Sequence, residues 1–208
     1  MIDQMEALSR TAARLRPWLV RGKPGPNLLF FTDPWRTPDP ERVAERLPAG
    51  AAVVFRAFGA TDAAIQGLRL REITRRRGLI LLVGADAGLA AELQADGVHL
   101  PERLSNGLPQ LRAAHPDWLI TLAAHDQAAA QAGSAVGADA LIVSSIFPSH
   151  SPSAGAPLGL DGLMAIVEAT QTPVYALGGI GAGTAEALVG TGIVGIAAVE
   201  ALSAPSPR

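Results

Sequence analysis

The sequence of 208 residues contains no cysteine and only one lysine, Lys23, among its 17 basic residues. The absence of cysteine excludes a disulfide framework, catalysis by a thiolate and metal sites with cysteine ligands. A Schiff base, or a lysine that holds a phosphate, would have to use Lys23. Abundant alanine, arginine, glycine and proline indicate a GC-rich genome, which explains the low lysine count but not its loss at particular positions.

An excess of charge of one sign and a long apolar run are also missing. The 17 basic and 19 acidic residues give a net charge of −2, so we expect no nucleic-acid partner and no membrane partner. No uncharged apolar run reaches the roughly 18 residues of a membrane span, because the longest candidate, residues 78–93, contains Asp86. Asp3 and Glu6 precede the first apolar stretch, which is not typical of a secretory signal, and we therefore expect a cytoplasmic protein.

The sequence does contain eight short apolar runs, most of them followed by an alanine-rich stretch of helical character. The runs are continuous rather than alternating, as expected for parallel strands that are covered on both faces. They lie at residues 28–32, 52–58, 79–83, 97–100, 119–123, 140–144, 174–177 and 193–199. The helix candidates lie at residues 38–47, 61–77, 89–94, 126–136, 160–169 and 182–189.

This pattern predicts the α/β class and a small (β/α)8 TIM barrel. A doubly wound nucleotide-binding sheet would carry Gly-x-Gly-x-x-Gly after its first strand, where this chain has Asp-Pro-Trp-Arg at residues 33–36. An extra amphipathic helix is predicted over residues 2–20, ended by the Gly/Pro-rich residues 22–26. We expect residues 1–26 to form this helix and a linker packed on a single barrel domain of residues 27–208.

In a TIM barrel the chemistry lies where the strands end. Gly178 and Gly179 follow the seventh predicted strand, where backbone N–H groups commonly bind phosphate; the alternative is a tight turn that needs positive φ. Ser149 and Ser151 follow the sixth strand and could line a phosphate site or belong to an ordinary surface loop. The sequence leaves both alternatives open.

Charged and imidazole side chains follow other strands. Arg56 lies in an otherwise apolar run, where it could bind an anionic ligand or form a structural ion pair with Asp33. His99, His125 and His150 follow the fourth, fifth and sixth strands, and any of them could transfer protons. A histidine at such a place is more often structural than catalytic.

Several of these segments together resemble the thiamine phosphate synthase and thiazole tautomerase family. The segments are Asp-Gly-Val-His-Leu at 96–100, Ile-Phe-Pro-Ser-His-Ser at 146–151, Pro-Leu-Gly-Leu at 157–160 and Ala-Leu-Gly-Gly-Ile at 176–180. Phe-Thr-Asp at 31–33 and Ala-His at 124–125 fit the same pattern. The resemblance covers about residues 28–202 and implies a small TIM barrel that joins hydroxymethylpyrimidine pyrophosphate to thiazole phosphate, with Mg²⁺ supporting the pyrophosphate that leaves.

The chain departs from this family mainly where the family binds pyrophosphate and magnesium. Gly84 and Ala85 stand where the family has Asn-Asp, and Glu102 is the only acid near its second magnesium aspartate. Phe58 and Pro152 replace family lysines. The resemblance thus implies Mg²⁺ as a cofactor whose aspartate ligands are not matched, and we assign no metal ligands.

Two further departures concern the thiazole half of the site. Glu200 replaces the serine of the family's Val-Ser after the eighth strand and places a carboxylate near the expected phosphate. The catalytic histidine of the tautomerase aligns near Ser145 and is absent, although His150 is close in sequence.

From these observations we expect a thiamine phosphate synthase-like transferase that binds a phosphorylated small molecule. Its catalytic residues would be Arg56, His125 and His150, and its binding residues would be Asp33, His99, Ser149, Ser151, Gly178 and Gly179. The alternative is a divergent paralogue without synthase activity, either a thiazole phosphate isomerase or tautomerase or a non-catalytic binder of a phosphorylated metabolite. Self-association into a homo-oligomer is left open.

Overall fold

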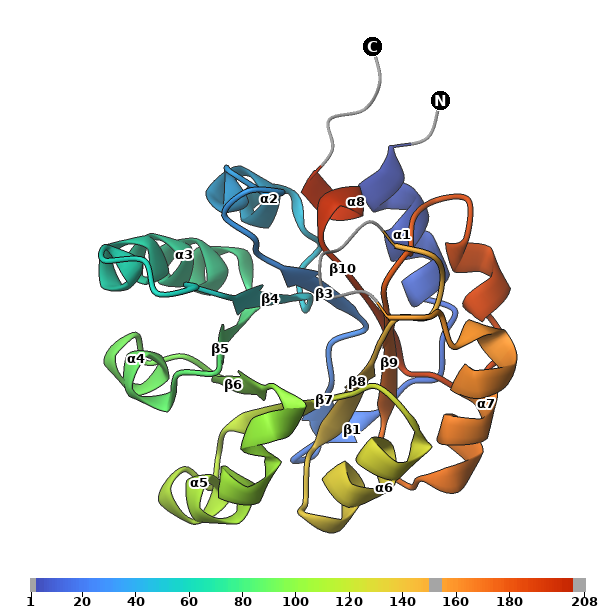
Figure 1. Cartoon of the computed structure of the whole chain (residues 1–208). Helices are drawn as coiled ribbons and strands as arrows, with labels where there is room; N and C mark the ends of the chain where they lie inside the picture. The colour runs from blue at the N-terminus through green and yellow to red at the C-terminus, as the bar shows by residue number, and fades with distance from the viewer. Residues whose placement is uncertain (1–2, 150–154, 204–208) are drawn as a thin grey trace.

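A closed barrel of eight parallel strands forms the centre of the molecule (Figure 1). The computed structural model describes residues 3–149 and 155–203. Each of the eight predicted apolar runs corresponds to one strand of the barrel. These strands are β3 (Leu28–Phe31), β4 (Ala52–Phe55), β5 (Ile80–Gly84), β6 (Gly97–Leu100), β7 (Leu119–Ala124), β8 (Ala140–Val143), β9 (Val174–Leu177) and β10 (Gly195–Ala198), and β10 closes the barrel by pairing with β3.

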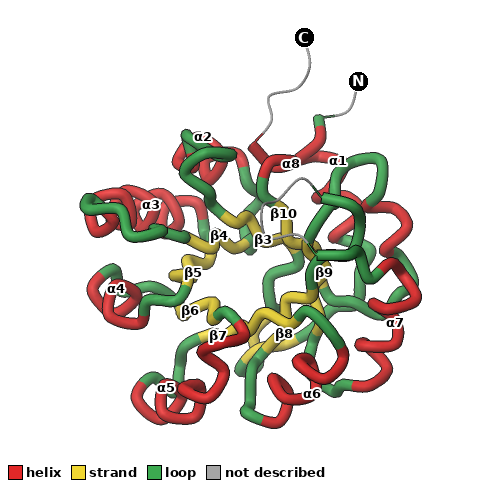
Figure 2. Tube along the Cα trace, viewed as in Figure 1, coloured by secondary structure: helices red, strands yellow, loops and turns green. Residues whose placement is uncertain are grey.

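Helices surround the barrel on its outside (Figure 2). They are α2 (Pro40–Arg46), α3 (Ala63–Arg77), α4 (Ala87–Glu92), α5 (Leu108–Ala114), α6 (Gln127–Ala135), α7 (Gly159–Ala169) and α8 (Glu200–Ser203), with 3₁₀ helices η1 (Glu102–Gly107) and η2 (Ala185–Leu188). Three of them begin at an aspartate, Asp39, Asp86 or Asp126, whose carboxylate accepts a hydrogen bond from a backbone N–H of the first turn. Such caps satisfy N–H groups that have no partner within the helix.

The strands separate two apolar clusters, as the continuous apolar runs predict. Phe31, Val54, Leu82 and Tyr175 fill the barrel interior. A second cluster lies between the strands and the surrounding helices and includes Leu70 of α3. Among residues 3–149 and 155–203, no helix has the length and apolar character that a bilayer crossing requires.

The N-terminal segment differs from the prediction of one helix over residues 2–20. Helix α1 (Gln4–Ala12) buries Met5 and Leu8 and ends at Ala12, and the predicted helix beyond this residue is wrong. Pro17 cannot donate a helical hydrogen bond, and the chain turns into an antiparallel hairpin of β1 (Leu19–Val20) and β2 (Lys23–Pro24).

This hairpin covers the barrel end at which the strands begin. Trp18 donates a hydrogen bond of 3.1 Å from Nε1 to the carbonyl of Pro26 and packs edge-on against Tyr175, with ring centroids 6.1 Å apart. Tyr175 donates its hydroxyl hydrogen to the same carbonyl. The indole N–H of Trp18 and the hydroxyl of Tyr175 are therefore satisfied within the protein, and the opposite end holds the candidate site.

Candidate active site at the barrel mouth

A cavity of about 330 Å³ opens where β4, β7, β8, β9 and β10 end. Five of the predicted site residues line it together: Arg56, His125, Ser149, Gly178 and Gly179. His150 and Ser151, which were also predicted, lie outside the described residues. We call the parts of this mouth the glycine side, formed by Gly178, Gly179 and the facing residues Ser145–Pro148, and the arginine side, formed by Asp33, Arg36, Arg56 and Gly84.

The glycine side is formed by two stretches of backbone in close contact. Gly178 and Gly179 have φ values of 99° and 66°, in the region that favours glycine. A Cβ atom on Gly178 would lie 2.7 Å from Ser145 Oγ, and one on Gly179 would lie 2.4 Å from the carbonyl oxygen of Pro148. The glycines are thus required by the turn itself, which was the structural alternative to a phosphate site.

The same turn also presents hydrogen-bond donors to the cavity. Gly179 and Ile180 both line the cavity, and within the described residues their backbone N–H groups donate to no protein acceptor. Successive N–H groups of this kind form a concavity that suits an anion such as phosphate. The turn can therefore serve both as a structural element and as an anion-binding surface.

His125 lies at the same mouth and is held by the end of β8. Its Nδ1 lies 3.0 Å from the carbonyl oxygen of Ser144 and 3.3 Å from Ser144 Oγ. Because a carbonyl can only accept, the contact at 3.0 Å places a proton on Nδ1. In the neutral imidazole Nε2 then carries the free lone pair, and it is the atom that could accept a proton from a ligand.

Arg56 dominates the arginine side. Its Nε donates to the carbonyl of Thr32 at 2.7 Å, and its Nη2 forms an ion pair of 3.5 Å with Asp33. The rings of Phe31 and Phe58 lie 5.5 and 5.0 Å from its Cζ. Burial lowers the pKa of Arg56 to about 10, with Asp33 opposing and Arg36 adding to this shift, so the guanidinium stays charged at neutral pH. Arg56 therefore forms the structural ion pair with Asp33 that the sequence suggested, and it also lines the cavity.

Asp33 fixes this side of the mouth. Its carboxylate accepts hydrogen bonds from the backbone N–H groups of Trp35 and Arg36 and from the Arg36 guanidinium, at 3.0–3.1 Å. Burial alone would raise the pKa of Asp33, but these hydrogen bonds outweigh the effect of burial and the pKa is lowered.

Arg36 also lines the cavity, and the sequence did not predict it as a site residue. The only signal for it was its position three residues after Asp33.

His99 lies apart from these groups, inside the barrel. Its Nδ1 is 3.0 Å from Thr121 Oγ1, and its ring packs edge-on against Phe31 with centroids 5.0 Å apart. Burial lowers the pKa of His99 to about 3, with smaller contributions from the charges of Arg56 and His125. His99 is therefore neutral at physiological pH and is not among the residues that line the mouth cavity.

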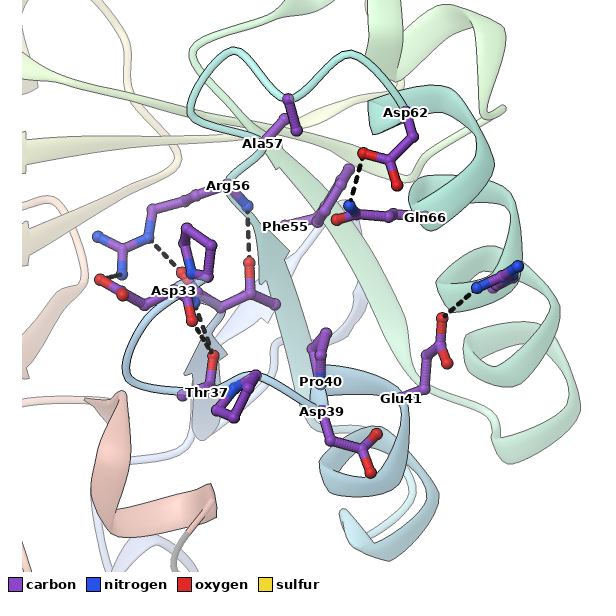
Figure 3. A pocket seen from close by; sticks show the side chains of 15 residues that line it. Asp33, Thr37, Asp39, Pro40, Glu41, Phe55, Arg56, Ala57, Asp62 and Gln66 are labelled. Carbon is purple, nitrogen blue, oxygen red and sulfur yellow. Dashed lines mark hydrogen bonds and ion pairs between the residues drawn. The ribbon is translucent and has the colours of Figure 1, made fainter.

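A second cavity, of about 300 Å³, lies beside the mouth between α2 and α3 (Figure 3). Figure 3 shows the side chain of Arg56 leaving the end of β4 toward Asp33 and away from Glu41 and Gln66. Glu41 forms an ion pair of 3.9 Å with Arg69 across this cavity. Arg56 thus lines both cavities, and its guanidinium is turned toward Asp33.

The residues of the mouth do not fit the magnesium ion that the resemblance implies. Gly84 and Ala85 offer no side-chain oxygen, and Glu102 lines a different depression, beside α6. Among the described residues no group of three or more histidine, aspartate and glutamate side chains could hold a metal ion. Since Mg²⁺ requires oxygen ligands, usually carboxylates and phosphates, the part of the chain that the structure describes provides no binding site of the family's kind.

Residues 28–202 match the thiamine monophosphate synthase family. Thiamine-phosphate synthase of Pyrococcus furiosus is 32% identical over 84% of this chain and 86% of its own length. The enzyme of the same name from Chloroflexus aurantiacus is 37% identical over 67% of this chain, and the bifunctional ThiM/ThiE protein of Symbiobacterium thermophilum is 36% identical over 67%. The matches span 64% and 29% of the lengths of these last two proteins.

A solved structure gives the same result. Thiamine phosphate pyrophosphorylase from Pyrococcus furiosus superposes with a TM-score of 0.75 at 30% identity, covering 86% of this chain and 88% of its own. Less similar barrels, such as an N-acetylmannosamine-6-phosphate 2-epimerase from Clostridium perfringens at 13% identity and a TM-score of 0.60, share the fold alone.

Proposed function

Because the chain belongs to the thiamine monophosphate synthase family, we propose that it is a thiamine phosphate synthase-like transferase of thiamine biosynthesis. The reaction would join hydroxymethylpyrimidine pyrophosphate to thiazole phosphate. The observation that supports this most strongly is the family match from β3 to α8, which includes the residues that line the mouth cavity except Gln4. A cytoplasmic location and self-association remain predictions.

The two sides of the mouth suit different parts of such a reaction. The N–H groups of Gly179 and Ile180 would bind the phosphate of the thiazole substrate. The Arg56 guanidinium would lie near the pyrophosphate that leaves, where a fixed positive charge stabilises the developing negative charge. His125 Nε2 is placed to accept or return a proton.

A steady-state assay with both substrates tests this proposal. Thiamine phosphate formation is measured by chromatography, first with Mg²⁺ and then with EDTA. We expect formation above a protein-free control and a loss of about 10²-fold or more in Arg56→Gln, because a major source of charge stabilisation is removed. No product under either condition would remove the synthase proposal.

A second function is favoured by the absent metal ligands at Gly84 and Ala85. Under this alternative the protein binds or isomerises a thiazole phosphate without coupling it to a pyrimidine. Thermal stabilisation by thiazole phosphate, with no product when the pyrimidine is added, would support it; a ligand at 100 times its Kd stabilises by about 2.7 kcal/mol. Conversion between thiazole tautomers, compared among wild type, His125→Ala and His150→Ala, would separate an isomerase from a binder.

A further inference from the structure

We propose that the Arg56 guanidinium takes the place of a divalent cation in the barrel mouth, so that a phosphate or diphosphate group binds there directly without metal. This inference rests on the proposed function in one respect, namely that the ligand binds in the barrel mouth. It concerns how the arginine side holds an anion, and it applies to either of the two functions considered above.

Arg56 lies in close contact with the end of β5. A Cβ atom on Gly84 would lie 3.0 Å from Arg56 Cγ and 3.4 Å from the carbonyl oxygen of Phe55. The aliphatic part of Arg56 therefore occupies the space into which a side chain at position 84 would project. Glycine and alanine stand at 84 and 85, where the resemblance to the family implies asparagine and aspartate, whereas Arg56 matches an arginine that the family also has. The metal ligands are therefore missing here while the arginine remains.

Arg56 is also held firmly by its neighbours. Its backbone N–H donates to Thr32 Oγ1 at 2.9 Å, and its Nε donates to the carbonyl of the same residue at 2.7 Å. The ring of Phe58, which stands where the family has lysine, covers the guanidinium at 5.0 Å. A guanidinium fixed in this way loses little conformational entropy when a ligand binds.

The Arg56 guanidinium also has donors without an acceptor. Arg56 Nη2 is buried and has no hydrogen-bond partner among the described residues, since its ion pair with Asp33 is 3.5 Å long. A buried donor of a charged group that lacks an acceptor is unfavourable. Nη2 itself is too enclosed for a ligand to reach, but Nη1, which also donates to no described residue, is not enclosed, and an oxygen of an anion in the mouth cavity can accept from it.

The charges on this side are consistent with direct binding of the anion. Arg36 and Arg56 together carry two positive charges, and Asp33, which pairs with both, carries one negative charge. These three side chains thus keep one net positive charge without any metal, while the carboxylate of Glu200 also lines the mouth cavity. A carboxylate ligand set would have the opposite sign and would need a cation before it could accept phosphate oxygens.

Isothermal titration with inorganic pyrophosphate and, separately, inorganic phosphate tests the proposal on the full chain. We expect at least one of them to bind in EDTA, with no gain in affinity when Mg²⁺ replaces EDTA. Arg56→Gln should weaken this binding by about 10-fold or more, whereas Arg56→Lys, which keeps the charge but loses the fixed fork of donors, should retain part of it. Binding that requires Mg²⁺, equal affinity in Arg56→Gln, or no binding of either anion would overturn the proposal.

A pair of glycine substitutions provides a matched control. Gly84→Ala adds one methyl group against Arg56 Cγ, while Gly107→Ala adds the same group where no atom lies within 4 Å. We expect Gly84→Ala to weaken metal-free anion binding about 3- to 10-fold by shifting the guanidinium, and Gly107→Ala to change it less than about 2-fold. Melting temperatures show whether each variant is folded, and equal affinities in two folded variants would contradict the proposal.

The result is independent of the coupling assay. Metal-free anion binding that depends on Arg56, in a protein that forms no thiamine phosphate, would remove the synthase function and keep this inference. Product formation that requires Mg²⁺, together with anion binding that requires Mg²⁺, would keep the synthase function and overturn this inference.

Discussion

The glycine side and the arginine side of the mouth differ in what they are built from. On the glycine side, backbone contacts backbone: Phe147 donates its N–H to the carbonyl of Gly178 at 3.1 Å, and Gly179 has no room for a side chain beside Pro148. On the arginine side, three side chains that follow two strand ends, Asp33, Arg36 and Arg56, are joined by ion pairs, and Arg56 also donates to the carbonyl of Thr32.

This difference explains which side keeps the family pattern. A backbone turn can only be made by residues that permit its φ values, so its sequence is tightly restricted. A network of side chains can change its members while the strands stay in place, because the barrel core lies beneath it. The arginine side has therefore lost the asparagine and aspartate of the family at Gly84 and Ala85 within the same fold, while Arg56 is kept.

The largest expected effect comes from placing a side chain on the glycine side. Gly179→Ala combines a φ of 66° with a Cβ 2.4 Å from the Pro148 oxygen, and we expect a loss of about 2–4 kcal/mol in the free energy of unfolding. Gly183→Ala, in the same loop but with no atom within 4 Å, is the control. Urea denaturation measures both, and a loss below about 1 kcal/mol in Gly179→Ala would show that the backbone contact is easily relaxed.

A smaller loss is expected from the arginine side. Asp33→Asn keeps the shape of the side chain but removes the charge that Arg36 and Arg56 share, and we expect a loss of about 2 kcal/mol in the free energy of unfolding. The pKa of Asp33 is lowered in the folded protein, so its contribution is complete above the unfolded value of 3.8 and disappears only as the pH falls through the lowered value. Denaturation at pH 7 should separate the two proteins, and the difference should shrink in strong acid.

If Asp33→Asn were as stable as the wild type at pH 7, the arginine side would be a set of independent surface charges. The comparison between the two sides would then lose its physical basis. The exposed pair Arg10–Glu6 on α1 offers a control, because Glu6→Gln should change stability by less than about 0.5 kcal/mol.

The sequence predicts the barrel well because its signal is local. Each strand is a continuous apolar run, and each run is read without knowledge of its neighbours. The N-terminal hairpin was missed because its register depends on the turn at Arg21 and Gly22, both with positive φ, and on Trp18 reaching Tyr175. Helix α5 was also missed, since its seven residues follow directly on η1.

The site is predicted less completely for the same reason. The strand-end rule brings Arg56, His125 and Gly179 together correctly, because the carboxyl ends of parallel strands share one end of a barrel. The contact of Arg56 with Gly84 joins two strands whose local sequences carry no sign of it. His99 follows the strand-end rule as well, but it is the last inward-facing residue of β6 and is covered by its neighbours.

Because His99 is buried inside the barrel, we expect the stability of the protein to depend on pH. The pKa of His99 falls from 6.5 to about 3 on folding, so below pH 6.5 the unfolded chain binds a proton that the folded chain does not. The free energy of unfolding should therefore decrease by up to about 1.4 kcal/mol per pH unit as the pH falls below 6.5. His99→Gln should remove this part of the dependence, and denaturation series at pH 4.5–7.5 measure it; parallel curves for the two proteins would contradict the assignment.

The smallest change in stability is expected for His125, which lies exposed at the mouth. His125→Ala should alter the free energy of unfolding by less than about 0.5 kcal/mol, as is usual for an exposed side chain. Its turnover should fall about 10²- to 10⁴-fold if Nε2 transfers a proton. Ser144→Ala is the informative comparison, because it removes Oγ at 3.3 Å but keeps the carbonyl at 3.0 Å that places the proton on Nδ1. It should keep most of the activity, and equal losses in the two variants would show that the hydroxyl, rather than the backbone, holds the imidazole in place.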